Sequence, residues 1–211
     1  ILNIKFIECD FIDKKNNHSF KLRSDLPGIY QQKNIRTVLT AINILRKKGY
    51  VFSDIMLQTA LQQVKKLTGL HGRWELIHEK PYMILDVGHN EDGVKQIIQQ
   101  LSVIAGTSTI RIVIGMVKDK EIEKVLALFP KEYHFYFTNA HLPRALPAAD
   151  LQRKAYELGL QGQAYENVND AIKQAVRDGT EQDIIVVCGS VFVVGEIMLL
   201  NTTINGSVPL N

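Results

Sequence analysis

Two short segments carry side chains whose types and spacing could bind a ligand. The first is Gly-Arg-Trp-Glu at residues 72–75, which contains Arg73, and the second is Asp-Val-Gly-His-Asn at residues 86–90. The second follows the apolar run 83–85, which predicts a buried strand, and open α/β sheets bind ligands outside the carboxyl ends of their strands. Arginine carries a permanent charge on a planar fork that matches phosphate oxygens. Together the two segments indicate a nucleotide site.

Each segment also has a structural interpretation. Asp86, His89 and Asn90 could form an N-capping cluster for a helix that begins near residue 91, because asparagine and aspartate are preferred cap residues. Arg73 could be a solvated residue paired with Glu75. The residue types and their spacing leave both alternatives open.

The common phosphate-binding motifs are absent from the 211 residues. No G-x-x-x-x-G-K-[ST] segment occurs, so this sequence carries no P-loop, and no G-x-G-x-x-G segment follows a predicted strand. Gly189 and Ser190 could bind an anion at a helix N-terminus, although a tight turn with a serine cap is favoured. For residues 118–120 a charged helix start with Asp119 as its cap is favoured. Arg144 is a further candidate for an anion site.

The composition excludes several classes of protein. Of 211 residues, 45% are hydrophobic and 22% are charged, which is typical of a globular protein. The 25 basic and 22 acidic residues are interleaved, so nucleic-acid binding has little electrostatic support. The apolar run 191–200 contains Glu196 and is too short to span a membrane. Cys9 and Cys188 show no metal-ligand spacing, and no signal peptide is visible, so we expect a reduced, cytoplasmic protein.

The first third of the sequence predicts a hairpin followed by two helices. Strands are expected at 2–8 and 19–23 around a polar turn. Apolar residues at helical spacing predict a helix through 35–45 and a second that begins after a Ser53 cap and runs to 67. Gly69 and Gly72 then mark a break, which predicts a domain boundary near residue 70.

Beyond this boundary strands and helices alternate. Strands are predicted at 83–87, 110–115, 135–138, 164–165 and 183–188. Helices are predicted at 94–104, 122–129, 147–159 and 168–176, with a last one after Ser190. Alternation with nearly continuous apolar strands predicts an α/β fold, a mostly parallel sheet with helices on both faces.

Four blocks, in the right order, resemble the signatures of folylpolyglutamate synthases and dihydrofolate synthases, members of the Mur ligase superfamily. Residues 72–90 resemble the pair G-R-x-E and L-D-[GV]-A-H-N-P, and residues 26–34 resemble L-x-G-x-H-Q-x-x-N-A. Residues 115–120 and 189–196 resemble G-x-x-x-D-K and G-S-x-x-x-x-G-E. The departures are Tyr30 for histidine, Ile35 for alanine, Gly88 for alanine and Glu91 for proline.

The resemblance implies a domain organisation. Residues 1–70 would be the C-terminal tail of a central ATPase domain, and residues 71–211 a Rossmann-like C-terminal domain. The P-loop of this family lies in the preceding part of the ATPase domain. We therefore expect the sequence, which starts without methionine, to be a fragment that works with a missing N-terminal part and is inactive alone.

The resemblance also implies a reaction. A carboxylate of folate or dihydropteroate attacks the γ-phosphate of ATP to give an acyl phosphate, and the amine of L-glutamate then displaces phosphate. ATP and Mg²⁺ would be the cofactors, with the magnesium ligands in the missing N-terminal part. No nucleic acid or membrane is expected as a partner.

Individual roles follow from the positions that match the family motifs. Asn34 would contact the nucleotide, Arg73 its phosphates and Asp86 the ribose hydroxyls, while His89 and Asn90 would lie near the amino-acid or phosphate end as the catalytic candidates. Two alternatives stay open. One is a muramyl-peptide ligase, against which Val87 and Glu91 argue because those enzymes favour D-Y-x-H-[NH]-P, and the other is a non-catalytic nucleotide-binding module.

Overall fold

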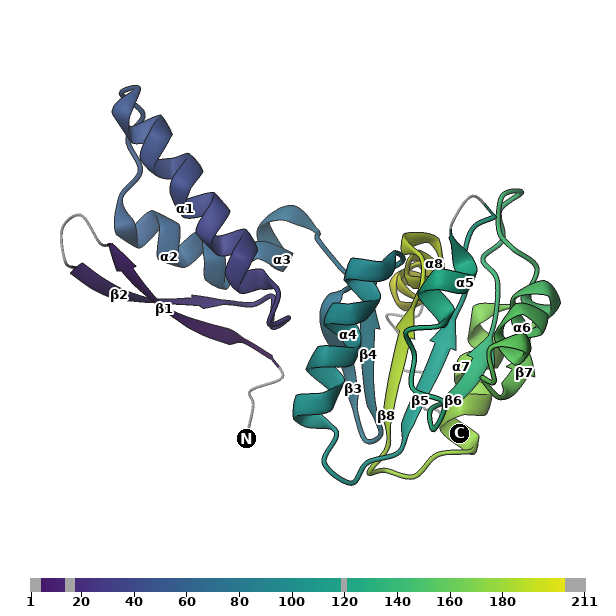
Figure 1. Ribbon diagram of the computed structural model, residues 1–211. Helices are drawn as coiled ribbons and strands as arrows, with labels where there is room; N and C mark the ends of the chain where they lie inside the picture. The colour runs from purple at the N-terminus through teal and green to yellow at the C-terminus, as the bar shows by residue number, and fades with distance from the viewer. Residues whose placement is uncertain (1–4, 14–17, 119–120, 204–211) are drawn as a thin grey trace. The chain divides into compact units, whose positions relative to one another are not determined.

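The computed structural model describes residues 5–13, 18–118 and 121–203. The chain forms two compact units, Ile1–Glu75 and Leu76–Asn211, and strand β3 (Arg73–Glu79) runs across the division between them. Figure 1 shows the elements of each unit. Within the described residues, no helix has the length and apolar character needed to traverse a lipid bilayer.

The first unit contains a hairpin and three helices. Its elements are β1 (Ile7–Asp13), β2 (His18–Ser24), α1 (Gln31–Lys47), α2 (Asp54–Gln62) and α3 (Val64–Thr68). The two strands pair antiparallel, with Ile7 opposite Ser24. β1 continues past the predicted end at residue 8, and residues 2–4 of the predicted strand lie outside the described residues. Among the described residues, the hydrophobic cluster of this unit has six buried members: Ile7, Cys9, Phe11, Leu22, Ile35 and Leu61.

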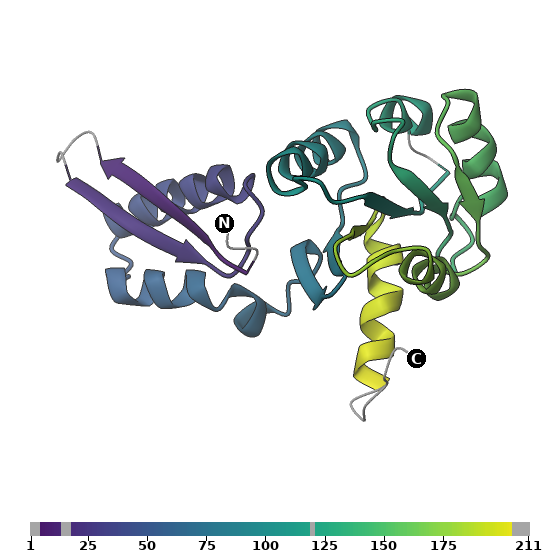
Figure 2. The ribbon, with the colours of Figure 1, turned by 90° about the horizontal axis from the view of Figure 1, so that it is seen from below.

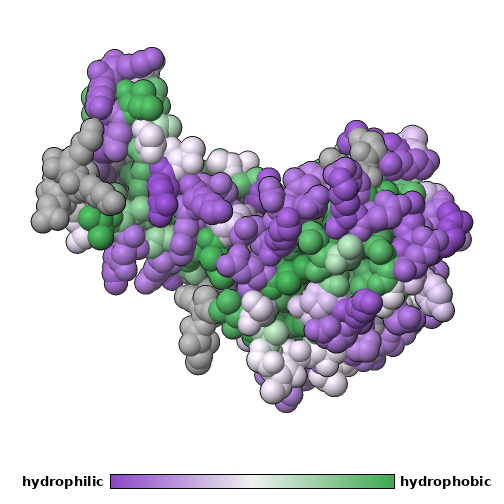
Figure 3. Space-filling model, viewed as in Figure 1, coloured by the Kyte–Doolittle hydropathy of each residue, from purple (hydrophilic) through white to green (hydrophobic). Residues whose placement is uncertain are grey.

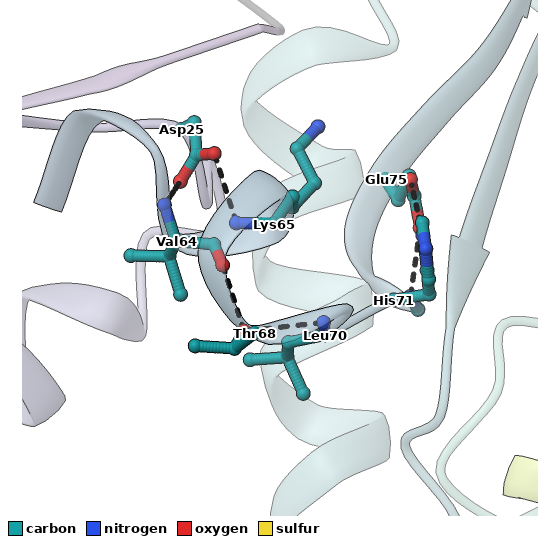
Figure 4. A network of polar contacts seen from close by, with 8 residues as sticks. Asp25, Val64, Lys65, Thr68, Leu70, His71 and Glu75 are labelled. Atoms are coloured by element: carbon teal, nitrogen blue, oxygen red, sulfur yellow. Dashed lines mark hydrogen bonds and ion pairs between the residues drawn. The ribbon is translucent and has the colours of Figure 1, made fainter. Parts of the chain in front are cut away.

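The predicted second helix is divided in two. Ser53 caps α2 as predicted, because its side chain accepts the Met56 N–H at 3.1 Å. The helix ends at Gln62, however, and α3 starts at Val64. The carboxylate of Asp25 accepts the backbone N–H groups of Val64 at 3.1 Å and Lys65 at 3.0 Å and thereby satisfies the exposed start of α3 (Figure 4). A buried acid from a distant part of the chain therefore sets this boundary.

The second unit is built on a six-stranded sheet with the order β3-β4-β8-β5-β6-β7. The strands after β3 are β4 (Tyr82–Asp86), β5 (Ile110–Ile114), β6 (His134–Phe137), β7 (Gly162–Ala164) and β8 (Ile184–Cys188). All neighbouring pairs from β4 to β7 are parallel. β3 and β4 are joined by two residues only, a connection that is possible only between antiparallel strands. The predicted mostly parallel sheet is confirmed, with β3 as an antiparallel edge strand that the sequence did not predict.

Helices cover both faces of this sheet, also as predicted. The elements α4 (Glu91–Ile104), α5 (Ile122–Leu126) and α6 (Ala148–Glu157) lie on one face (Figure 2). The elements α7 (Val168–Arg177) and α8 (Val191–Thr203) lie on the other. Because the central strands β5 and β8 are buried along their whole length, they consist of apolar residues with little alternation, except for the buried Arg111 in β5.

Candidate functional site

The sheet has a topological switch point at the carboxyl ends of β4 and β8. These strands are parallel neighbours, yet the helix that follows β4 and the helix that follows β8 lie on opposite faces of the sheet. In α/β sheets in general, ligands bind at such a point, outside the carboxyl ends of the strands. The loops at this point are residues 87–90 and 189–190, with 115–118 following the neighbouring strand β5.

Glycines let the three strand ends approach one another closely. The Gly189 N–H donates to the Gly88 carbonyl at 2.9 Å, and the Gly115 N–H donates to the Cys188 carbonyl at 3.3 Å. Gly189 has φ +94°, and a Cβ atom there would lie 2.6 Å from the Gly115 carbonyl oxygen. The loops therefore form one backbone-linked edge around the switch point.

Asp86 ends β4 and is 3% exposed. Its Oδ1 accepts the Gly88 N–H at 2.8 Å, which shapes the turn out of the strand. Burial, together with the charge of Asp86, raises the pKa of the neighbouring Cys188 thiol. Cys188 is therefore a neutral core residue.

His89 has a defined tautomer. Its Nδ1 lies 2.9 Å from the Val87 carbonyl oxygen. A carbonyl can only accept a hydrogen bond, so Nδ1 carries the hydrogen, and in the neutral ring Nε2 is then the acceptor. The half-buried imidazole is thus oriented by its own loop, as a group that exchanges protons must be.

Asn90 is the N-cap of α4. Its Oδ1 accepts the Gly93 N–H at 2.8 Å, so the capping interpretation is confirmed for this residue. Glu91 and Asp92 occupy the first turn, where negative charge complements the helix dipole. A structural duty at this position does not exclude a chemical one, because the Asn90 amide also carries two N–H donors and the residue is exposed.

Two predicted binding residues lie in the first unit. Asn34 is exposed on α1, and its amide donates to Gln31 Oε1 at 2.8 Å. Arg73 is half-buried at the start of β3. The Glu75 carboxylate accepts the Gly72 N–H at 2.9 Å and lies 3.0 Å from Nδ1 of His71 (Figure 4). None of the described ion pairs joins Arg73 to Glu75, so the structure does not support the predicted alternative of such a pair.

The remaining candidates lie in loops beside the switch point. Ser190 accepts the Phe192 N–H at 3.1 Å, which confirms the favoured serine cap. The backbone N–H of Lys118 donates to the Arg144 carbonyl at 3.0 Å, and the Arg144 guanidinium lies 5.1 Å from the centre of the Phe192 ring. Asp119, the predicted cap after Lys118, lies outside the described residues.

The structure adds contacts that the sequence did not reveal. Glu196 on α8 accepts the backbone N–H of His141, and its carboxylate lies 3.1 Å from Nδ1 of that histidine. Glu75 and His71 form the second such pair. Both glutamates belong to recognisable motif blocks, but no spacing rule joins Glu196 to a residue 55 positions away.

The donor set of the described residues fits a nucleotide better than a metal ion. Within that part of the chain, no group of three or more His, Cys, Asp or Glu side chains could hold a metal. The polar groups at the switch point are instead one carboxylate, one imidazole and one amide on a single loop. Such groups form hydrogen bonds with hydroxyl and amine groups. Phosphate groups are instead bound by arginine.

The chain is similar to several known proteins. Residues 72–191 match the model of the family "Mur ligase, glutamate ligase domain". The chain is 28% identical over 178 residues to dihydrofolate synthase/folylpolyglutamate synthase of Bacillus subtilis, covering 83% of this chain and 40% of that protein. It is also 28% identical over 182 residues to a UDP-N-acetylmuramoyl-L-alanyl-D-glutamate–2,6-diaminopimelate ligase of Listeria monocytogenes, covering 81% of this chain and 36% of that protein.

Solved structures give the same result. The bifunctional folylpolyglutamate synthase/dihydrofolate synthase of Yersinia pestis, complexed with AMPPNP and a manganese ion, matches with a TM-score of 0.65 and 28% identity, over 77% of this chain and 38% of that one. E. coli FolC in complex with DHPP and ADP matches with a TM-score of 0.67 and 25% identity, over 79% and 39%. A further structure of a bifunctional enzyme of this kind has Mn, AMPPNP and L-glutamate bound.

The fold and the matched residues define a Mur ligase C-terminal domain. The chain belongs to the family "Mur ligase, glutamate ligase domain". The predicted resemblance to folylpolyglutamate and dihydrofolate synthases is confirmed by these relatives. The chain spans less than half the length of the relatives described above.

Proposed function

We propose that this chain is part of an ATP-dependent ligase that adds L-glutamate to a folate or dihydropteroate carboxylate. The observation that carries the proposal is the loop 86–90 at the switch point of the sheet, where a buried carboxylate, an oriented imidazole and an amide follow one strand. The family match and the names of the relatives support the same reaction class.

The chemistry has two steps. A carboxylate oxygen of the folate substrate attacks the γ-phosphorus of ATP, the bond to the β,γ-bridging oxygen breaks, and ADP leaves. The amine nitrogen of L-glutamate then attacks the acyl carbon, phosphate leaves, and the amine loses a proton to give the amide. Phosphoryl transfer of this kind depends mainly on positioning and on the stabilisation of charge.

The residues of this chain would divide the tasks as follows. Asp86, an acceptor-only group, binds the ribose hydroxyls, and Arg73 binds the phosphate oxygens, with Asn34 as a further nucleotide contact. His89 and Asn90 act at the amino-acid or phosphate end: Nε2 of the neutral imidazole accepts a proton, and the Asn90 amide donates hydrogen bonds. Mg²⁺ would be held by residues of the missing N-terminal part and would neutralise charge on the phosphates.

We further propose that the first unit is the tail of an ATPase domain and that the chain alone does not turn over ATP. Several large hydrophobic side chains are exposed on this unit. They include Ile12, Ile44, Ile55, Met56 and Leu67. Figure 3 shows hydrophobic residues of the unit at its surface, among hydrophilic ones. These exposed apolar side chains support the packing of this unit against another part of a protein.

The test is an assay of the complete open reading frame that contains this sequence. With ATP, Mg²⁺, L-glutamate and dihydropteroate or a folate, we expect phosphate release that depends on both the glutamate and the pterin substrate. The 211-residue chain alone should release none. Glutamate ligation by the chain alone would contradict the proposed division, and an absence of ligation by the complete protein would contradict the proposed reaction.

A muramyl-peptide ligase is the second candidate, because the Listeria relative is also 28% identical to this chain. Val87 and Glu91 argue against it, as they replace residues of the pattern that those enzymes favour. Offering the complete protein a UDP-muramyl peptide beside the pterin substrates separates the two. We expect ligation of the pterin substrate only.

A further inference from the structure

The turn that carries Arg73 is closed by a buried carboxylate. Glu75 is 8% exposed, and its Oε2 accepts the Gly72 N–H at 2.9 Å. Its two oxygens also lie 3.0 and 3.1 Å from Nδ1 of His71, which makes Glu75 the centre of the turn (Figure 4). Hydrogen bonds to an ionised carboxylate are stronger than those between neutral groups. The side chain of Glu75, which follows Arg73, therefore links the turn to His71 and Gly72, which precede Arg73.

The backbone on either side of Arg73 adopts left-handed conformations. Gly72 has φ +68° and Trp74 has φ +55°. For glycine this is inexpensive, but a bulky residue with positive φ is an outlier that persists only when its surroundings enforce it. The Trp74 side chain is completely buried, so burial on one side and the Glu75 carboxylate on the other fix this conformation.

This conformation has a consequence for the charge of Arg73. In a regular strand, residues two apart point to the same face, so Glu75 would be the nearest partner of the Arg73 guanidinium. The left-handed Trp74 interrupts the alternation, and the Glu75 carboxylate instead contacts Gly72 and His71. None of the ion pairs in the described part of the chain includes Arg73. The turn keeps its arginine unneutralised by its own glutamate.

We propose that Glu75 is a positioning residue that presents the Arg73 guanidinium to the phosphates of the nucleotide. It acts by fixing the turn. Its carboxylate, which would otherwise compete with phosphate for Arg73, is held by Gly72 and His71 instead. This inference rests on the proposed role of Arg73. A merely structural role of Glu75, in which the turn supports only the fold, is the competing explanation, and it predicts that any effect of Glu75 is independent of Arg73.

A double-mutant cycle on the 211-residue chain separates the two explanations. ATP with Mg²⁺ is titrated into the wild type, Arg73→Ala, Glu75→Ala and the double variant, with affinity read from backbone amide shifts and from the fluorescence of Trp74, the single tryptophan of the chain. We expect Arg73→Ala to weaken ATP binding about tenfold or more, since it removes charge-assisted hydrogen bonds. Glu75→Ala should weaken it by about threefold to tenfold, and the double variant should bind like Arg73→Ala alone.

Two control variants complete the design. Glu79→Ala removes the same charge from the exposed end of β3 and should bind ATP like the wild type. Glu75→Gln can still accept the Gly72 N–H and should recover part of the affinity. Thermal unfolding of each variant, with binding measured well below the transition, keeps the comparison to folded protein.

Each outcome has a distinct meaning. Wild-type affinity in Glu75→Ala, or an equal loss with and without Arg73, overturns the positioning role while the role of Arg73 stands. Wild-type affinity in Arg73→Ala, or an absence of ATP binding by the wild type into the millimolar range, overturns the proposed nucleotide site itself.

Discussion

Asn90 has both a structural and a proposed chemical task, and single substitutions can separate them. Replacing Asn90 with alanine removes the cap of α4 and should lower the free energy of unfolding by about 1 kcal/mol. Asn90→Ser keeps a cap acceptor and should retain most of that stability. If the amide also acts in catalysis, both variants should lose ligase activity in the complete protein. If ligase activity instead follows stability, so that Asn90→Ser is active and Asn90→Ala is not, Asn90 acts only as a helix cap.

At Gly189 the backbone conformation and the space around it both require glycine. Gly189→Ala places a Cβ 2.6 Å from the Gly115 carbonyl oxygen at a φ of +94° and should lower the free energy of unfolding by about 3 kcal/mol or more. Gly106→Ala is the matched control in the same unit, because Gly106 also has positive φ but nothing lies within 4 Å of its Cβ. It should lose only about 1 kcal/mol. Urea unfolding measures both, and equal losses would exclude the proposed crowding of the strand ends.

At the scale of elements, a polar network that is buried except for Asp178 joins β5, β6 and the loop before β8. The Arg111 guanidinium donates to Asp183 at 2.7 Å and to the Tyr136 hydroxyl at 2.8 Å, and that hydroxyl donates to Asp178 at 2.9 Å. Burial and the bond to Asp178 raise the pKa of Tyr136 to about 12, although Arg111 opposes the shift. The folded state therefore binds the phenolic proton more tightly than the unfolded state.

This pKa has a predictable effect at alkaline pH. Because the folded pKa of Tyr136 lies above its unfolded value of about 10, its contribution is complete below pH 10 and is lost as the pH rises toward 12. Urea unfolding should show a decline of about 2 kcal/mol over that range, and Tyr136→Phe should reduce the decline while lowering stability at pH 8. Tyr156→Phe removes an exposed phenol as the control. An unchanged pH profile in Tyr136→Phe would contradict the assignment.

The elements also show what the sequence could and could not predict. Period and turn residues predicted the five parallel strands, the helices between them and the caps at Ser53 and Ser190, because these depend on local chemistry. For Asn90 the sequence left a cap and a binding role open, and the structure shows the cap. The break between α2 and α3 was missed, since the Asp25 carboxylate that causes it is 39 residues away. Strand β3 was missed because its partly buried residues show no clear alternation. The loop 86–90 was found as a candidate site from its residue types, but the contacts of Glu75 depend on a left-handed tryptophan that no pattern predicts.

For the whole molecule, the position of the domain boundary decides which fragment folds. The sequence places it near residue 70, whereas the compact units divide after Glu75, within β3. A fragment of residues 71–211 keeps the complete hairpin of β3 and β4. A fragment of residues 76–211 lacks Arg73, the buried Trp74 and Glu75.

We expect residues 71–211 to unfold in urea at the midpoint that the second unit shows in the whole chain. Residues 76–211 should have a lower urea midpoint. We expect their free energy of unfolding to be lower by about 2 kcal/mol or more, because burial of one large aromatic side chain alone contributes that much. Circular dichroism measures the unfolding transition of both fragments. The two fragments differ only by the five residues 71–75. Equal midpoints for the two fragments would mean that the start of β3 belongs to the first unit. The turn at Arg73 would then be no part of the C-terminal domain.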